Sequence, residues 1–305
     1  MRNGITRIMA CSMVASVLFC GSCYGDTFVR SVKVSEEPVI DGSASDSVWA
    51  SAEKVITHDN VAGIDMEIRT VHTDDRIFFL VVFPDKDESR THKSWVWDRD
   101  IEEYVMGNDR EDVFTFKWNI VPEESKDLRI DSDDDYRTDI WFWKACRTDP
   151  EGFADDKFAV LSDSKVENST PVLSRNGKEK FYFRDGDKGK AAYSSKMAVD
   201  HIGDTLPRFE TGTPSGSRAD IKAKGKWEDG KWVVEFSRAM DTGNDDDVRF
   251  FIGKKYQFGV SRYEMAGRKV MQDLSQPFYG AGEISEKMIL SFEEKNPGRT
   301  DEHIL

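Results

Sequence analysis

Cysteine is nearly absent from most of this chain. Three of its four cysteines lie within the first 25 residues, and only Cys146 follows them. A single cysteine excludes an internal disulfide in that larger part. The sequence Cys-x-x-Cys-His does not occur, which excludes covalent attachment of a c-type haem to this chain. Any haem would have to be held non-covalently.

Long apolar runs are also scarce. Residues 8–19 form an apolar run that is too short to span a bilayer and that follows two arginines. This pattern predicts a secretory signal peptide over residues 1–25, with cleavage after Gly25. A lipoprotein processed at Cys23 is the weaker interpretation, because Cys20 stands where that motif has leucine. Since no other segment predicts a transmembrane helix, we expect an exported protein, periplasmic or secreted.

Basic residues are too few to balance the acidic ones. The chain has 43 Lys and Arg against 57 Asp and Glu, a net charge of −14. Removal of Arg2 and Arg7 with the predicted signal peptide takes it to −16. So acidic a surface repels phosphate backbones and anionic lipids, which argues against nucleic-acid and membrane-surface partners. A neutral ligand or a redox partner protein with a basic docking face fits better.

Catalytic motifs are missing as well. No serine lies in a nucleophile-elbow sequence, and no glycine loop of the phosphate-binding type occurs. The five histidines have no metalloprotease spacing. Carboxylates are abundant, but none is marked as a catalytic pair. We therefore expect a non-catalytic protein that binds a ligand or transfers electrons.

Strand patterns dominate what is present. Residues 64–83 alternate apolar and polar side chains and then run continuously apolar after a Thr-Asp-Asp turn, which predicts a hairpin. A second hairpin is predicted over residues 226–238 around Asp229-Gly230. Further strands are expected at residues 113–120, 255–263 and 287–292. Because long amphipathic helices are lacking, we predict an all-β fold, an antiparallel β-sandwich with long loops and few short helices.

The predicted domain organisation is simple. Residues 26–305 are expected to form a single β-sandwich, because neither half of the chain has enough strands to close a core. Residues 162–226 are rich in Ser, Gly, Lys, Asp and Thr and show weak periodicity. We interpret this segment as a loop-rich insertion that folds over one end of the sandwich or is partly mobile.

Two acidic runs, residues 131–135 and 244–248, are interpreted as solvated loop tips. The alternating aspartates of the first run have the spacing that begins a calcium loop. Tyr136 replaces the glycine of that motif, and Phe142 replaces its final glutamate. Calcium at Asp131, Asp133 and Asp135 is therefore a secondary cofactor hypothesis.

Several blocks of the sequence resemble known families. The block PVIDGSASDSVWASAEKV (38–55) resembles the opening strand of the carbohydrate-binding-module-9 and DOMON type of β-sandwich, in which a tryptophan after an Ile-Asp-Gly turn packs on the core. The later blocks are similar to the haem-b-binding domain of the ethylbenzene dehydrogenase gamma-subunit type. They comprise residues 111–120, 139–157, 230–250 and 256–269.

The resemblance implies a non-covalent haem b that passes single electrons, in a subunit or partner of a redox enzyme. In the gamma subunit the haem iron is held by a methionine and a lysine. Lys269 is our first choice for the lysine. Residues 119–140, where the methionine would lie, contain none, which leaves Met265, Met106 and Met271 as substitutes. His92 and His201 are the competing iron ligands.

A haem also needs an apolar slot and cations for its propionates. Trp141 and Trp143 are expected on one face of a strand, with Lys144 and Arg147 at its end, and these four form the predicted cofactor pocket. The competing interpretation is that the tryptophans are core residues and that the two cations pair with the acidic residues 155–156.

A second function, from a different class, is a carbohydrate-binding module. In that case Trp95, Trp97, Trp141 and Trp143 would stack on sugar rings. Sugar binding needs tryptophans exposed in a cleft, whereas haem binding needs a donor directed into a buried slot. The burial of these tryptophans therefore bears on the choice.

Overall fold

The computed structural model describes residues 26–59, 64–121, 125, 127–263 and 287–293. Within these ranges the secondary structure consists of β-strands and three short 3-10 helices, η1 (Ser47–Ser51), η2 (Asp149–Glu151) and η3 (Ser217–Ala219). The described part of the chain contains no helix that is long and apolar enough to cross a membrane. The predicted signal peptide lies outside the described residues.

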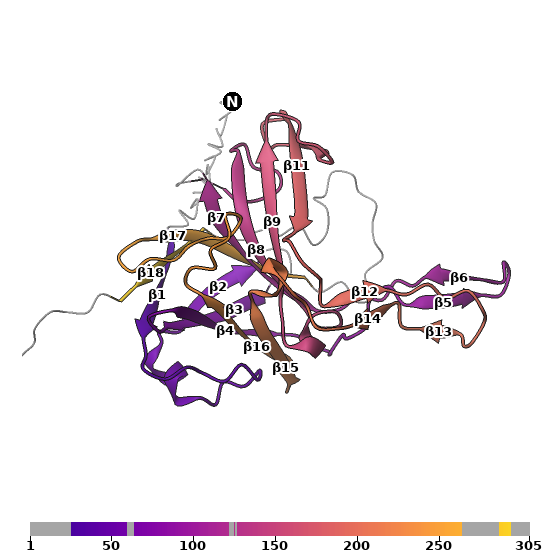
Figure 1. The fold of residues 1–305 in the computed structure, drawn as a ribbon, viewed down its shortest axis with the longest axis horizontal. Coiled ribbons are helices and arrows are strands. Elements are labelled where there is room, and N and C mark those ends of the chain that lie inside the picture. The colour runs from indigo at the N-terminus through magenta and orange to yellow at the C-terminus, as the bar shows by residue number, and fades with distance from the viewer. Residues whose placement is uncertain (1–25, 60–63, 122–124, 126, 264–286, 294–305) are drawn as a thin grey trace, which may run out of the picture.

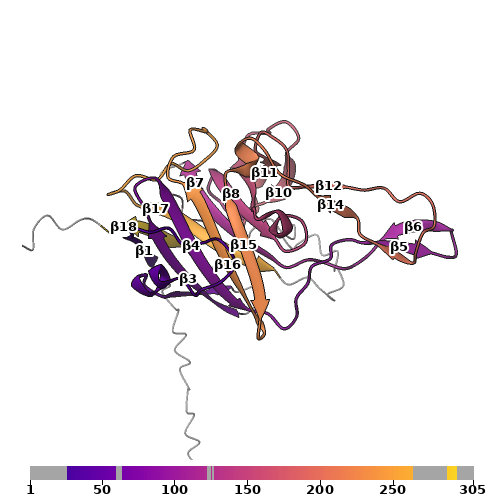
Figure 2. The same cartoon turned by 60° about the horizontal axis from the view of Figure 1, so that its bottom comes forward.

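Two sheets, called sheet A and sheet B, form the body of the molecule (Figure 1). Sheet A has the order β10 (Thr170–Leu173), β11 (Glu179–Gly186), β9 (Asp155–Ser162), β8 (Tyr136–Lys144), β7 (Val113–Val121), β17 (Tyr256–Tyr263), β18 (Met288–Phe292), β1 (Thr27–Lys33). Sheet B has the order β1, β3 (Ile64–His72), β4 (Arg76–Pro84), β16 (Lys231–Ala239), β15 (Lys222–Glu228), and β2 (Val55–Asp59) also pairs with β3. Figure 2 shows β3, β4, β16 and β15 side by side.

Strand β1 belongs to both sheets. Residues 27–31 pair in parallel with β18, and residues 32–33 pair in parallel with β3. The other neighbouring strands of both sheets are antiparallel. The predicted antiparallel β-sandwich is therefore confirmed, with β1 as a parallel exception.

The main core lies between the two sheets and is strongly aromatic. Phe116 of β7 contacts Phe79 of sheet B at 4.8 Å between ring centroids, and Trp143 of β8 contacts Trp232 of sheet B at 4.9 Å. Successive residues of a strand point to opposite faces, so β8 directs Trp141 and Trp143 inward while Ile140 and Phe142 join a second apolar cluster on the outer face of sheet A.

Both predicted hairpins are present. Strands β3 and β4 pair as expected over residues 64–83. Strands β15 and β16 pair around Asp229 and Gly230, whose φ values of 51° and 75° both lie in the left-handed region. Asp-Gly supports such a turn because glycine carries no Cβ and aspartate tolerates this conformation.

Glu235 of β16 explains the opening block of the sequence. Its carboxylate accepts hydrogen bonds from the backbone of Gly42 at 2.8 Å and from Trp49 Nε1 at 2.9 Å. Trp49 is buried in a third apolar cluster on sheet B. The Ile-Asp-Gly turn and the tryptophan are thus fixed to the sandwich by the same side chain.

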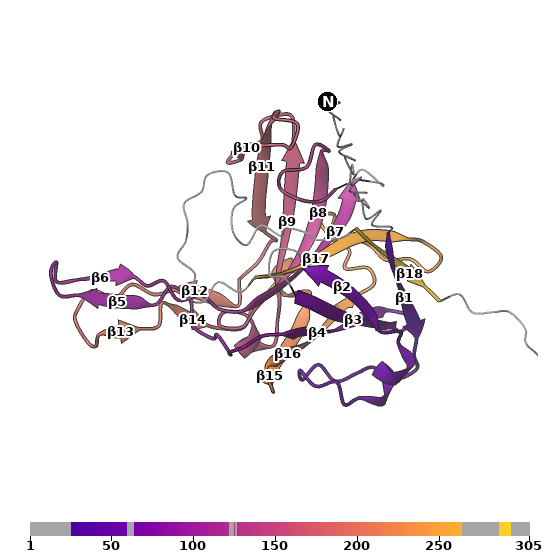
Figure 3. The same ribbon diagram turned by 180° about the vertical axis from the view of Figure 1, so that it is seen from behind.

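The segment over residues 162–226 is richer in strands than its composition suggests. Its first part adds the β10–β11 hairpin to the edge of sheet A. Its second part contains β12 (Tyr193–Ser195) and β14 (Phe209–Thr211), which pair, and β13 (Thr205–Leu206), which pairs with β5 (Trp95–Asp98). Together β5, β6 (Glu103–Met106) and β13 form an arm that projects from the sandwich (Figure 1, and from behind in Figure 3).

Candidate functional site

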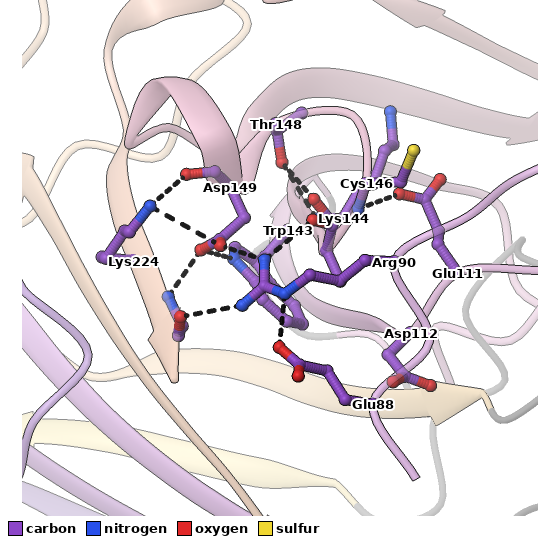
Figure 4. Close-up of polar contacts among 12 residues, drawn as sticks. Glu88, Arg90, Glu111, Asp112, Trp143, Lys144, Cys146, Thr148, Asp149 and Lys224 are labelled. Carbon is purple, nitrogen blue, oxygen red and sulfur yellow. Dashed lines mark hydrogen bonds and ion pairs between the residues drawn. The ribbon is translucent and has the colours of Figure 1, made fainter. Parts of the chain in front are cut away.

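The candidate site lies where β8 ends and the chain turns toward η2. We call it the β8-end cluster. It comprises His92, Glu111, Lys144, Arg147, Asp155, Tyr193 and Phe209. Strand β8 supplies the first cation, the turn after it supplies the second, and the β12–β14 pair contributes the aromatic side chains. Figure 4 shows part of this cluster and its surroundings.

Asp149 fixes the turn that carries the cluster. One oxygen of its buried carboxylate accepts hydrogen bonds from Trp143 Nε1 at 2.9 Å and from the Gly225 backbone at 2.6 Å. The other accepts from Arg90 at 2.6 Å (Figure 4). Thr148 closes the turn by accepting a hydrogen bond from the Lys144 backbone at 2.9 Å. The end of β8 is therefore held to both sheets.

Glu111 holds the segment after the turn. Its carboxylate accepts hydrogen bonds from the backbone of Cys146 at 2.7 Å and of Arg147 at 3.0 Å, and it forms an ion pair with the Arg147 guanidinium. Burial, with a further contribution from Glu111, raises the pKa of the Cys146 thiol to about 11. Cys146 is therefore protonated at neutral pH and a poor nucleophile or metal ligand.

Lys144 is the buried cation of the cluster. It forms an ion pair with Asp155 and donates a hydrogen bond to the Tyr193 hydroxyl at 3.0 Å. Burial lowers the pKa of Lys144 to about 8 despite the nearby carboxylate. Burial opposes the ionisation of Asp155, but Lys144 and its other cationic neighbours hold the pKa of that carboxyl well below its usual range.

The strand pair β12–β14 covers the two cations with aromatic rings. The Arg147 guanidinium lies 5.0 Å from the centroid of the Tyr193 ring and 5.2 Å from that of Phe209. The Lys144 ammonium lies 4.7 Å from the Tyr193 ring. Such cation–π contacts are favourable when the cation is partly desolvated. Residues from the segment that was predicted to be loop-rich, 162–226, therefore cover the cluster.

His92 is the titratable group best suited to act as an electron-pair donor in this cluster. Its side chain is 12% exposed, and the buried Nδ1 lies 3.5 Å from Glu111 Oε1 without forming a hydrogen bond to any described residue. Its ring lies 5.7 Å from that of Phe209. Burial, followed by the charges of Arg147 and other cations, lowers the pKa of His92 to about 2. The imidazole is therefore neutral at physiological pH, the form that ligates metals.

The predicted pocket residues are separated by the sheet. Trp141 and Trp143 are completely buried in the main core between the sheets. Lys144 and Arg147 lie on the other side of sheet A or beyond its end, beside Phe142, Tyr193 and the loops. Packing accounts for the burial of the tryptophans, and their contact with a ligand stays a prediction.

The competing interpretation of the cations is partly correct. Lys144 does pair with Asp155, as that interpretation expected. Arg147 pairs with Glu111 and not with Asp155 or Asp156. Asp156 is out of reach of Arg147, because its side chain points to the opposite face of β9. Glu111 was missed, although two acidic residues directly before a buried strand could have marked it. Tyr193 and Phe209 lie in the segment of weak periodicity, so no sequence pattern marked them as site residues.

The proposed iron ligands fall in different places. Lys269, Met265 and Met271 lie outside the described residues. Met106, at the end of β6 on the arm, is 49% exposed, and its sulfur accepts a hydrogen bond from Arg208 at 2.9 Å. His201 is also exposed on the arm, with its ring 4.5 Å from Trp97.

The chemistry of the β8-end cluster fits part of what a haem requires. His92 is a neutral imidazole, a common axial ligand, and Arg147 and Lys144 are cations of the kind that pair with propionates. Both cations are already neutralised by carboxylates, so an incoming propionate would have to replace or share Glu111 or Asp155. The described residues thus offer one axial donor and two cations.

The first acidic run does not form the calcium loop considered from its spacing. Asp133 accepts a hydrogen bond from the backbone of Asn176 at 3.0 Å, and Asp135 pairs with Lys180. Asp131 contacts Arg175. Within the described chain these three carboxylates do not converge on a common point. They fasten the loop before β8 to the β10–β11 hairpin instead.

Comparison with known families bears on the identity of the chain. The family model described as ethylbenzene dehydrogenase matches residues 29–271. The chain belongs to the ethylbenzene dehydrogenase family. The match includes all of the β8-end cluster and also the positions of Lys269 and Met265. No curated protein sequence matches the chain.

Two similar solved structures are carbohydrate binding modules of family 9 from Caldicellulosiruptor kristjanssonii. The complex with glucose has a TM-score of 0.41 and 11% sequence identity, and the similarity covers 90% of this chain and 100% of that one. The complex with cellotriose has a TM-score of 0.39 and 12% identity, covering 92% and 98% of the two chains. Similarity at this level says nothing about what this member of the ethylbenzene dehydrogenase family binds.

Proposed function

We propose that this protein is an exported haem-b-binding protein that transfers electrons as a subunit or partner of a redox enzyme, without catalysing a reaction itself. The observation that carries the proposal is the family match over residues 29–271. The bound haem would supply a one-electron redox centre. The chain would supply the axial ligands, the cations for the propionates and the exclusion of water.

The β8-end cluster supports this assignment through its protonation states. His92 is kept neutral by burial and by neighbouring cations, so it needs no proton release before it can donate an electron pair. Lys269 would have to lose its proton to bind iron, which burial promotes by disfavouring the ammonium form. We keep Lys269 with a methionine as the first choice of ligand pair and His92 as the described alternative.

The arm supports the role of a subunit or partner. Its side chains and the adjoining loop include several large apolar residues that are exposed: Val96, Ile101, Val105, Met106, Met197, Val199 and Ile202. Exposed apolar side chains gathered on one projecting element mark an interaction site more often than chance exposure does. The acidic net charge of the chain would add attraction to a basic partner that weakens as salt is raised.

Two of the four tryptophans proposed for carbohydrate binding cannot contact a sugar in this structure. Trp141 and Trp143 are completely buried, so no face of either ring is open to a sugar. Trp95 and Trp97 are half-buried on the arm. The Trp95 ring lies under Arg208, and the Trp97 ring contacts Tyr104 and His201. The burial of Trp141 and Trp143 also removes these tryptophans from the predicted haem pocket, so the family match is what favours the haem proposal.

Hemin titration of the purified protein, with residues 1–25 removed, tests the proposal. We expect saturable uptake at micromolar hemin and a low-spin Soret spectrum, because two strong donors hold the iron. Lys269→Ala should shift the Soret band and open a coordination site, whereas Lys269→Arg should not restore it because guanidinium stays protonated. Lys254→Ala, at an exposed lysine, is the matched control.

Different results of this experiment contradict the choice of iron ligand and the proposed function. If His92→Ala shifts the band and Lys269→Ala does not, His92 is the ligand and the haem function stands. If the wild-type protein takes up no hemin at micromolar concentration, the electron-transfer function is wrong. Binding of soluble oligosaccharides, measured by tryptophan fluorescence, would then be the next measurement.

A further inference from the structure

Four buried carboxylates converge between the sheets, away from the β8-end cluster. Asp139 of β8 and Asp156 of β9 face inward, Asp187 follows β11, and Asp247 lies in the loop before β17. We call these four residues the aspartate cluster. Asp139 and Asp156 are 0% exposed, and Asp187 and Asp247 are 4% exposed. The cluster therefore joins four chain segments at a site closed to solvent.

The spacing of the carboxylates matches an ion-binding site. Oxygens of Asp139, Asp156 and Asp247 lie within 4.8 Å of one another, and so do oxygens of Asp187, Asp246 and Asp247. Calcium binds oxygen ligands at about 2.3 to 2.6 Å, so two ligands on opposite sides of the ion are about 5 Å apart. Each group could therefore surround one ion with little movement, and Asp247 would belong to both.

The hydrogen bonding of the cluster leaves oxygens without partners. Asp139 Oδ2 accepts hydrogen bonds from Arg238 at 2.5 Å and from Trp141 Nε1 at 3.2 Å. By contrast, neither oxygen of Asp156 or of Asp187 accepts a hydrogen bond from any described residue, and Oδ1 of Asp247 accepts none either. Buried polar atoms are rarely left in this state, because their desolvation is then uncompensated.

The charge of the cluster is also unbalanced. Arg238, which is itself 0% exposed, forms an ion pair with Asp139. One guanidinium cannot neutralise four carboxylates, and an uncompensated buried charge is strongly destabilising. Burial and mutual repulsion raise the pKa of Asp139 to about 6 and that of Asp187 to about 8, and they raise the pKa of Asp156 as well.

We propose that the aspartate cluster is a structural calcium site that fastens the loop before β17 and the segment after β11 to the sandwich. A divalent cation balances the excess negative charge and supplies the unpartnered oxygens with a ligand. Calcium fits better than magnesium, because magnesium keeps several of its waters and demands a tighter octahedral geometry. The proposal does not depend on haem binding.

The site differs from the calcium hypothesis based on residues 131–135. It draws Asp247, and Asp246 in the second group, from the second acidic run, 244–248, which the sequence suggested to be a solvated loop tip. Within that run Asp245 is exposed, but Asp247 is buried. The expectation of a fully solvated tip is therefore wrong for Asp247, because the loop folds back onto β8 and the Val248 backbone donates a hydrogen bond to Asp139 at 3.1 Å.

Metal titrations of the chelator-treated protein test the proposal. Terbium, a calcium substitute, should show luminescence sensitised by Trp141, whose indole contacts Asp139, and calcium should displace it. Calcium at pH 7.5 should also raise the melting temperature, since it binds the folded state alone. Asp156→Asn should weaken calcium binding at least tenfold, while Asp133→Asn, in the exposed first run, should leave it unchanged.

Other outcomes overturn the assignment. If wild-type protein has the same melting temperature with calcium and with chelator and gives no sensitised terbium signal, the cluster is protonated and not a metal site. If Asp133→Asn weakens binding as much as Asp156→Asn, the ion binds elsewhere. Equal affinity for magnesium would contradict the choice of calcium. Asp187→Asn replaces Asp156→Asn if the latter does not fold.

Discussion

Asp155 and Asp156 are adjacent on β9, yet their side chains lie on opposite faces of sheet A and meet opposite surroundings. Asp155 faces outward to Lys144 and Arg218, and these cations hold its pKa low against the effect of burial. Asp156 faces inward to Asp139, and burial together with that charge raises its pKa. Strand alternation alone separates the two environments. One carboxylate therefore completes an ion pair, and the other forms no ion pair with a described residue.

Asp155→Ala should lower the free energy of unfolding by about 3 to 5 kcal/mol, because it leaves the Lys144 ammonium buried without its counter-ion. Urea denaturation at pH 7 measures this change. The double variant Lys144→Met with Asp155→Leu should recover part of the loss, since it removes the buried Lys144 charge and leaves Arg218 and Lys157, which are partly exposed, without this partner. A loss below about 1 kcal/mol for Asp155→Ala would show that the pair behaves like an exposed surface pair.

Gly225→Ala should destabilise the protein by about 1 to 3 kcal/mol, the usual range for overpacking. A Cβ at this position would lie 2.4 Å from Trp143 Cζ2, closer than atoms can approach, so the indole or β15 must shift. Gly203→Ala is the matched control, because its Cβ would approach only Leu206, at 3.7 Å. Denaturation midpoints compare the two. Equal midpoints would show that Trp143 moves freely.

Trp141→Ala and Trp143→Ala separate the packing role of these residues from a ligand role. Both side chains are 0% exposed, and we expect each substitution to cost about 3 to 5 kcal/mol of unfolding free energy. Trp97→Ala, on the arm, should cost less than about 1 kcal/mol. If hemin affinity falls in the folded fraction of the two core variants, the tryptophans also serve the cofactor pocket, as their sequence position suggested.

Local pattern was enough to predict several strands, but not most of those in residues 162–226 and not the arrangement of the sheets. The alternation over residues 64–83 and the Asp-Gly turn at 229–230 depend on neighbouring residues, so the sequence shows them directly. The parallel pairing of β1 with β18 joins residues more than 250 positions apart, and no local pattern encodes it. The sandwich was therefore predictable as a class, whereas the order of its strands was not.

The candidate site was predictable only in part, for the same reason. Lys144 and Arg147 follow an aromatic strand and were visible as a group. Their actual partners include Glu111 and Tyr193, which are distant in sequence, and Tyr193 lies in a segment without periodicity. The burial of Asp247 could not be predicted, because an acidic run is expected to be exposed to solvent unless the surrounding fold is known.

The last prediction concerns the pH dependence of stability in the haem-free protein. His92 has a pKa of about 2 in the folded chain and about 6.5 when unfolded. Because the folded pKa is lowered, the unfolded state binds a proton that the folded state does not. The stabilisation by neutral His92 is therefore complete above about pH 6.5 and is lost as the pH falls below it, by at most about 1.4 kcal/mol per pH unit.

His92→Gln cannot take up this proton, so its unfolding free energy should fall less steeply between about pH 6.5 and pH 4. Urea denaturation at several pH values measures the slopes, and identical slopes for His92→Gln and the wild type would contradict the buried, neutral state of His92.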